Sequence, residues 1–206
     1  MDTTRKTKRL MWLDIAKGIA CLLVIVGHTV SLESPLRHYI FSFHMPLFFI
    51  LAGFTFRPKP WKEIVPSSVK RLLLPYLLVF IIWDGRQLLA TPEAFSPQTL
   101  YSYSMMFLFA SGTDVVPFGY PAVGMIWFLA ALFASRLIMN ALARLVDDKG
   151  LPFSVLGILC TITGAIGYGV GSIAHIDLPL SLDVSMVAVF FMWCGMAQCQ
   201  KSSGKC

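Results

Sequence analysis

The sequence predicts an all-α fold, a polytopic bundle of transmembrane helices that forms a single membrane domain over residues 1–206. Hydrophobic residues make up 56% of the chain and charged residues only 14%, a balance that a soluble domain of this size does not have. Long apolar runs recur along the chain, and most approach the roughly 20 residues that a membrane span needs. These runs are apolar on all sides instead of alternating with a period of two, which argues against a β-barrel.

The first two apolar runs predict a helical hairpin. They cover residues 11–32 and 39–56, and a short polar turn at 33–38 joins them. Basic residues precede the first run and recur from Arg57 to Arg71, after the second run. By the positive-inside rule we expect a multi-pass protein of the inner cell membrane, with its N-terminus in the cytoplasm and the 33–38 turn outside.

The rest of the chain predicts three to five further membrane segments, which gives five to seven in total. The third run, 72–89, has Pro75 near its cytoplasmic start, and Asp84 and Arg86 lie towards its outer end. The run at 100–110 is short for a span, so it either extends towards Pro117 or forms a re-entrant piece. The last three runs cover residues 125–145, 152–174 and 182–198.

The net charge of +6 does not indicate a nucleic-acid partner, because the basic residues gather at the ends of the apolar runs. Membrane lipids are the partners that this distribution predicts. No spacing of metal-ligating residues is present in the sequence, so no metal site is expected.

Charged residues within the first run indicate a functional site, because charge at bilayer depth is costly and needs a nearby partner. Lys17 and His28 are eleven residues apart, which is about three helical turns, so both project from one face. Asp14 lies within about 40° of that face by the same arithmetic. Asp14 can also act structurally, as an i,i+3 partner that neutralises Lys17.

A second histidine, His44, lies in the second run. His28 and His44 are equidistant from residue 36, in the middle of the turn, so an antiparallel hairpin places them at one depth near the outer leaflet. Histidine is the usual residue for proton transfer near neutral pH, so we predict that the pair is catalytic. A hydrogen-bonded packing role is the alternative for each ring.

Several strings resemble the acyltransferase-3 family of integral membrane O-acyltransferases, and most closely its branch of fucose 4-O-acetylase-like proteins. The strings are Leu13–Gly18 followed by Val26–His28, Phe43–Phe49 with Ala52–Phe54, Arg71–Tyr76 and Trp127–Leu129. The resemblance implies transfer of an acyl group, usually acetyl from acetyl-CoA, to a hydroxyl of a carbohydrate. The acceptor would be a cell-surface or lipid-linked glycan, and a homo-oligomer is possible.

The resemblance also implies roles for individual residues. The basic residue of the first helix and the histidine eleven positions later are essential in the family, and they correspond to Lys17 and His28. We expect His28 to act as general base, with an acyl-histidine intermediate as the alternative. Lys17, Lys70 and Arg71 would contact the phosphates of coenzyme A, although Arg71 can equally snorkel to the interface. Asp14 and Trp127 would support the site structurally.

Eleven helical residues span about 16 Å, similar to the length of a pantetheine arm, so a donor held near the cytoplasm would reach the histidines. Family members usually have about ten spans, and these 206 residues correspond to the N-terminal part of such a domain. Two other interpretations stay open: a small transporter or flippase component with an Asp14–Lys17–His28 relay, and an inactive truncated remnant.

Overall fold

The computed structural model describes residues 11–31, 33–90, 95–113, 115 and 118–203. Over these residues the regular secondary structure is helical, and the one β-type contact is an isolated antiparallel bridge between Val115 and Tyr120. The predicted all-α fold is confirmed.

Eight α-helices and four short helical segments make up the described part of the chain. The α-helices are α1 (Met11–Thr29), α2 (Pro35–Phe54), α3 (Trp61–Ser68), α4 (Leu74–Ala90), α5 (Pro97–Phe109), α6 (Trp127–Asp148), α7 (Phe153–Tyr168) and α8 (Leu182–Ser203). The short segments are the π-helices η1 (Val69–Leu73) and η3 (Gly169–Ile173) and the 3-10 helices η2 (Gly124–Ile126) and η4 (Pro179–Ser181).

Five helical stretches are long and apolar enough to cross a membrane, which agrees with the five to seven expected. They are Met11–Thr29, Trp61–Ala90, Gly124–Asp148, Phe153–Ile173 and Pro179–Ser202. Helix α2 has 20 residues but is not among them. Its two histidines and Arg37 lower its apolar character, although it forms the predicted hairpin with α1.

The third span begins earlier than the sequence analysis expected. Helix α3, the segment η1 and helix α4 form one continuous 30-residue stretch from Trp61 to Ala90, so much of the basic stretch expected before residue 72 is helical. Pro75 is the second residue of α4, two positions after the end of η1, and a proline has no N–H to donate to the carbonyl of Arg71. The wider π turn accommodates the missing hydrogen bond, so the helix continues through Pro75. From the sequence, the span was expected to start near this proline.

Helix α5 has 13 residues and does not extend towards Pro117. Ser96 caps its start by accepting a hydrogen bond from the amide of Thr99, and the helix ends at Phe109 because Ala110 adopts a left-handed conformation with φ 52°. The alternative of a span extended towards Pro117 is therefore wrong.

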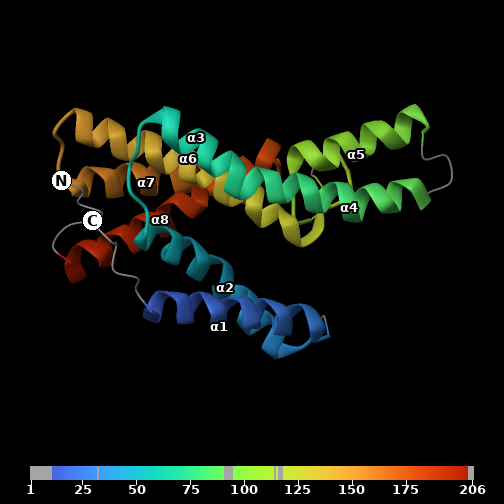
Figure 1. Ribbon diagram of the computed structural model, residues 1–206, viewed down its shortest axis with the longest axis horizontal. Helices are drawn as coiled ribbons and strands as arrows, with labels where there is room; N and C mark the ends of the chain where they lie inside the picture. Colours follow the sequence, from blue (N-terminus) through green and yellow to red (C-terminus); the bar gives the residue numbers. More distant parts are fainter. Residues whose placement is uncertain (1–10, 32, 91–94, 114, 116–117, 204–206) are drawn as a thin grey trace, which may run out of the picture.

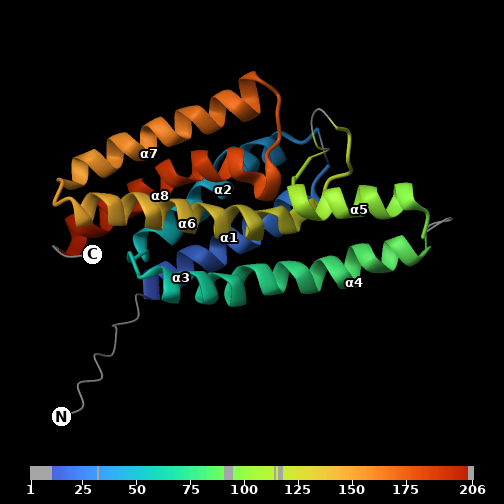
Figure 2. The same cartoon turned by 90° about the horizontal axis from the view of Figure 1, so that it is seen from above.

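Helix α8 organises the bundle, since it contacts α2, α6 and α7. Helix α1 packs mainly on α2, and the two form a pair beside the α6–α8 group (Figure 1). Seen from above, α7 lies at one edge and the α3–α4 stretch at the opposite edge (Figure 2). At one end of the molecule α4 and α5 run side by side beyond the other helices in both views, with Tyr76 and Phe107 in ring contact at 5.2 Å.

Two glycines fix the contact between α2 and α8. A Cβ atom added at Gly53 would overlap the carbonyl of Met192, and one added at Gly195 would overlap the carbonyl of Ile50. The two backbones therefore touch directly, as small residues allow in membrane bundles. This contact holds α2, and with it His44, at a defined depth in the bundle.

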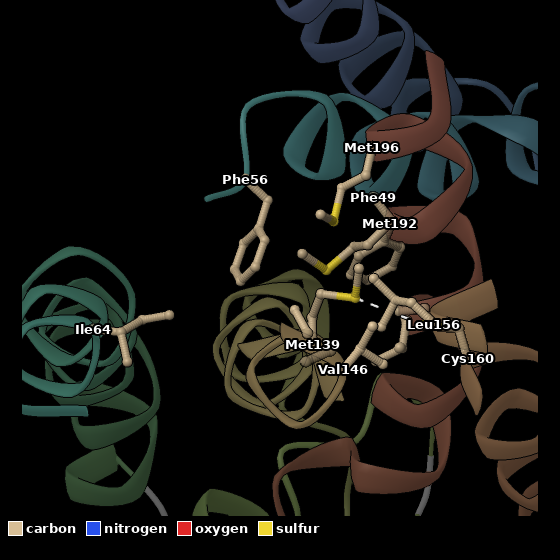
Figure 3. Packing of buried hydrophobic residues seen from close by; sticks show 13 residues of the cluster. Phe49, Phe56, Ile64, Met139, Val146, Leu156, Cys160, Met192 and Met196 are labelled. Carbon is tan, nitrogen blue, oxygen red and sulfur yellow. Dashed lines mark hydrogen bonds between the residues drawn. The ribbon is translucent and has the colours of Figure 1, made fainter. Parts of the chain in front are cut away.

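The largest core cluster lies around α6 and joins α2, α3, α7 and α8 (Figure 3). Methionine side chains fill much of it: Met139, Met192 and Met196 converge there, and the Sγ of Cys160 lies 3.8 Å from the Sδ of Met139. Phe56 lies between these residues and Ile64 of α3 in the close-up. This core ties the α3–α4 stretch to the rest of the bundle.

Candidate active site

A cavity of about 680 Å³ lies between α1, α2, residues 112–113 and the start of α6. His28 and His44 both line it, and so does Trp127. The two histidines therefore line one cavity, although the hairpin turn lies between Thr29 and Pro35 and is not centred on residue 36 as expected. A volume of this size is in the range of ligand sites, which run from about 300 to 1,000 Å³.

His44 is buried, with 5% of its surface exposed, and its tautomer is set by its own helix. Its Nδ1 lies 2.9 Å from the carbonyl oxygen of Ile40. A carbonyl can only accept, so Nδ1 donates, and in the neutral ring Nε2 carries the lone pair. His44 is therefore arranged to accept a hydrogen bond, or a proton, at Nε2.

His28 lies near the last turn of α1 and is exposed in this chain. The ring of Phe41 lies between the two imidazoles, with centroids 5.2 Å from His28 and 5.0 Å from His44. Next to His28, a Cβ added at Gly27 would lie 2.6 Å from the ring of Phe41, so α1 approaches α2 closely at this point. The two histidines share the cavity through Phe41 instead of stacking on each other.

Arg37 is a cavity residue that sequence reasoning missed, because the sequence placed it in the polar turn 33–38, whereas in the structure it lies in the first turn of α2. Its guanidinium lies 4.7 Å from the centre of the Phe41 ring, and its Nη1 donates to the carbonyl of Val30 at 3.4 Å. Arg37 thus fixes the turn and places a positive charge at the cavity that holds both histidines. The signal available in the sequence was a positive charge two residues after Pro35, at the same end of the hairpin as His28.

Lys17 does not line this cavity. It is half-buried on α1, about three turns before His28, while Asp14 is exposed one turn earlier. Of the two α1 residues Lys17 and His28, only His28 lines the cavity. Their placement on the same face of α1 holds by helical geometry.

The basic residues expected to bind a donor lie in the π segment of the long helix. Lys70 and Arg71 belong to η1 and are exposed, about 14 Å along the helix from Trp61 at 1.5 Å a residue. They therefore lie deeper in the long helix than expected from a span that starts at residue 72.

Arg136 of α6 faces the same region and was not recognised from the sequence. Its Nε donates to the hydroxyl of Ser68 at 3.4 Å, and its guanidinium lies 5.8 Å from the centre of the Phe56 ring. It also interacts electrostatically with Arg71. A charged residue inside a span is by default a functional-site candidate, and this rule was the signal that could have identified Arg136.

Trp127 begins α6 at the cavity wall, where it packs against a glycine. A Cβ atom added at Gly112 would lie 2.7 Å from the Trp127 indole, so the loop after α5 lies directly on that ring. Trp127 therefore lies beside the two histidines at the cavity wall, where a structural role was expected.

The model of a family described as an acyltransferase domain matches residues 10–199, nearly the whole chain. The chain belongs to the acyltransferase-3 family. It is an enzyme family, so the transporter interpretation loses its support.

Two nodulation proteins named NolL are similar to this chain. The protein from Mesorhizobium japonicum is 29% identical over 144 residues, which cover 63% of this chain and 35% of the relative. The protein from Sinorhizobium fredii is 28% identical over 145 residues, which cover 63% of this chain and 36% of the relative. The chain thus spans about a third of the length of these relatives. No solved structure matches it.

Proposed function

We propose that this membrane acyltransferase moves an acetyl group from acetyl-CoA to a hydroxyl of a cell-surface or lipid-linked glycan, in the inner cell membrane with its N-terminus in the cytoplasm. The observation that carries the proposal is the single cavity of about 680 Å³ lined by His28, His44 and Arg37. These groups supply a base and a positive charge beside space for two substrates. The family supplies the class of reaction.

His28 is the proposed general base, because its ring is the accessible one of the two. It removes the proton of the acceptor hydroxyl while that oxygen forms a bond to the thioester carbonyl carbon. The carbon–sulfur bond then breaks, and the departing coenzyme A thiolate takes the proton back from the imidazolium. His44, with its lone pair on Nε2, accepts a hydrogen bond in the same cavity and orients the acceptor.

Positively charged side chains lie in two places, at the histidine cavity and further along the bundle. Both support an anionic acyl donor. Arg37 lies at the histidine cavity, where it can stabilise the oxyanion that forms on the attacked carbonyl. Arg71 and Arg136 lie together further along the bundle, and arginine pairs are suited to phosphate groups. From Trp127 at the cavity wall to Arg136 is nine residues of α6, about 14 Å.

Lys17 and Lys70 are assigned to the same donor through their charge alone. Neither lines the histidine cavity, so their contribution is to the positive potential that attracts phosphate and not to the chemical step. Asp14, one turn before Lys17, then limits that potential at the start of α1.

The test is an acetyl-transfer assay in membranes that contain the full chain, with radiolabelled acetyl-CoA and a glycan extract as acceptor. His28→Ala should lower transfer by about 10²- to 10⁴-fold, the usual contribution of a general base. Lys17→Ala should raise the KM for acetyl-CoA. His38→Ala is the matched control, because His38 also bonds the carbonyl four residues earlier, at 3.1 Å, but lies outside the cavity. Full transfer by both His28→Ala and Lys17→Ala would end the proposal.

A further inference from the structure

A second cavity, of about 510 Å³, lies between α4, α5 and residues 121–126. Asp84 lines it from α4, together with the aromatic side chains of Trp83 and Tyr103. Met125 lines both this cavity and the histidine cavity, so the two cavities adjoin with this residue between them. None of the expectations drawn from the sequence used Asp84.

Asp84 is a buried carboxylate with an unsatisfied oxygen. Only 9% of its surface is exposed, and its Oδ2 has no hydrogen-bond partner among the described residues. A buried polar atom without a partner is costly, and in a native structure a molecule bound in the adjoining cavity is one way to satisfy it.

Gln87 lines the same cavity three residues after Asp84, yet Oδ2 of Asp84 has no hydrogen-bond partner among the described residues, and two further polar side chains of α4 have contacts elsewhere. The hydroxyl of Tyr76 donates to the carbonyl of Phe107 at 2.8 Å. The guanidinium of Arg86 lies over the ring of Trp83, 5.5 Å from its centre. Asp84 is therefore left with one oxygen that can accept a hydrogen bond from a molecule in the cavity.

We infer that the Asp84 cavity binds a pyranose ring of the acceptor, with Asp84 accepting a hydrogen bond from one of its hydroxyls. This inference rests on the proposed function for the role of that ring as acceptor. A sugar ring presents hydroxyl donors at its edge and C–H groups on its faces, and the cavity offers one acceptor oxygen among aromatic walls. Its junction with the histidine cavity at Met125 allows a neighbouring part of the acceptor to reach His28.

The test measures binding without acetyl-CoA, on the full chain in lipid nanodiscs, by saturation-transfer NMR. The probe is methyl α-D-glucopyranoside. The control probe is 2-methoxytetrahydropyran, which has the same ring without hydroxyls, and cyclohexylamine tests for a cationic ligand. We expect the glycoside to bind and Asp84→Leu to weaken its binding about tenfold or more. Asp84→Asn keeps an accepting oxygen and should retain most of the binding.

Asp84→Leu removes an unpaired buried carboxylate from an apolar site, so the variant should fold. A second variant gives an independent check: Met125 is 63% exposed, so Met125→Trp can be accommodated and should obstruct the junction and lower glycoside binding. Asp148→Asn, at the exposed end of α6, should bind the glycoside as the unmodified chain does.

The inference is overturned if the glycoside does not bind, if Asp84→Leu binds it equally well, or if either control probe binds at Asp84 in its place.

The acetyl-transfer assay separates this inference from the proposed function. If transfer depends on His28 but Asp84→Leu keeps the KM for the acceptor unchanged, the sugar site is wrong and the proposed function stands. If the glycoside binds through Asp84 but the protein transfers no acetyl group, the sugar site stands and the proposed function fails. We expect a raised acceptor KM in Asp84→Leu, with the KM for acetyl-CoA unchanged.

Discussion

The Nδ1 of His44 donates to the carbonyl oxygen of Ile40, one turn earlier on α2, and this bond determines which nitrogen of the ring is free. Pro46 follows two residues later and leaves the carbonyl of Ser42 without its helical donor. The ring is also held at 5.0 Å from Phe41. His44 therefore enters the cavity with a fixed tautomer and a restricted orientation, as a group that positions a substrate requires.

We expect His44→Asn to lower kcat for acetyl transfer by about 10²-fold or more, because the amide can still bond Ile40 but offers no imidazole Nε2 to the cavity. The KM for acetyl-CoA should change little. The measurement is transfer kinetics in membranes, and nitrogen-15 NMR of labelled histidine should show the Nδ1–H tautomer for the neutral ring.

His38→Asn is the control for this prediction, since His38 makes the same type of bond to Ser34 on the exposed side of α2. If His44→Asn retained full transfer while His28→Asn abolished it, His44 would be a packing residue. An Nε2–H tautomer in the NMR spectrum would contradict the geometry directly.

Arg136 is expected to bind the donor. Arg136→Gln should raise the KM for acetyl-CoA about tenfold or more while kcat changes less, because a guanidinium that contacts phosphate acts mainly on binding. Arg136→Lys keeps the charge but loses the planar fork, so it should recover only part of the effect. Transfer kinetics with varied acetyl-CoA concentration provide the measurement.

Arg144→Gln is the matched variant for Arg136, because Arg144 lies two turns further along α6 and bonds the carbonyl of Lys59 instead. Its KM for acetyl-CoA should stay unchanged. A normal KM in Arg136→Gln, together with a lower melting temperature, would mean that Arg136 serves only its contacts with Ser68 and Phe56.

The histidine cavity was accessible from the sequence because it depends on local geometry. A short turn fixes the antiparallel hairpin and brings His28 and His44 to one cavity, although the turn is centred between Thr29 and Pro35 and not at residue 36, so His44 lies further from it than His28 does. Arg136 was not accessible in this way, since the partner that defines its role, Ser68, is 68 residues away. Asp84 was visible as a charge in a span, but its unsatisfied oxygen emerges only from packing.

The start of the third span shows why a helix boundary predicted from local sequence signals can be wrong. Basic residues and Pro75 together resemble the start of a helix, and a local rule places the boundary there. The chain instead continues as helix from Trp61, because the π turn η1 accommodates the proline and buried Ile64 and Ser68 pack against the bundle. Tertiary packing thus overrides a local signal, and Lys70 and Arg71 change from loop to helix.

The α2–α8 contact should be intolerant of any side chain. Gly195→Ala places a Cβ against the carbonyl of Ile50 and should destabilise the bundle by about 1–3 kcal/mol or more. Gly85→Ala is the control, because nothing lies within 4 Å of its added Cβ, and it should stabilise α4 by about 0.5–1 kcal/mol. Thermal unfolding in detergent measures both, and equal melting temperatures would show that the two helices do not touch at Gly195.

Asn140 should control the attachment of the segment before α3. Its side chain is fully buried, its Oδ1 accepts from the amide of Lys59 at 2.9 Å, and its Nδ2 donates to the carbonyl of Lys59 at 3.1 Å. We expect Asn140→Leu to destabilise the protein by about 1–3 kcal/mol, because the Lys59 amide loses its partner and the Lys59 carbonyl keeps only Arg144. Hydrogen exchange at residues 57–60, followed by mass spectrometry, should become faster.

Ser135→Ala is the control for Asn140, since the hydroxyl of Ser135 is equally buried but bonds only the carbonyl of Leu132 in its own helix. It should leave exchange at residues 57–60 unchanged. Because the freed segment leads directly into the stretch that carries Arg71, Asn140→Leu should also raise the KM for acetyl-CoA, although less than Arg136→Gln does. Unchanged exchange in Asn140→Leu would mean that Arg144, which donates to the same carbonyl at 3.3 Å, is sufficient to hold Lys59 in place.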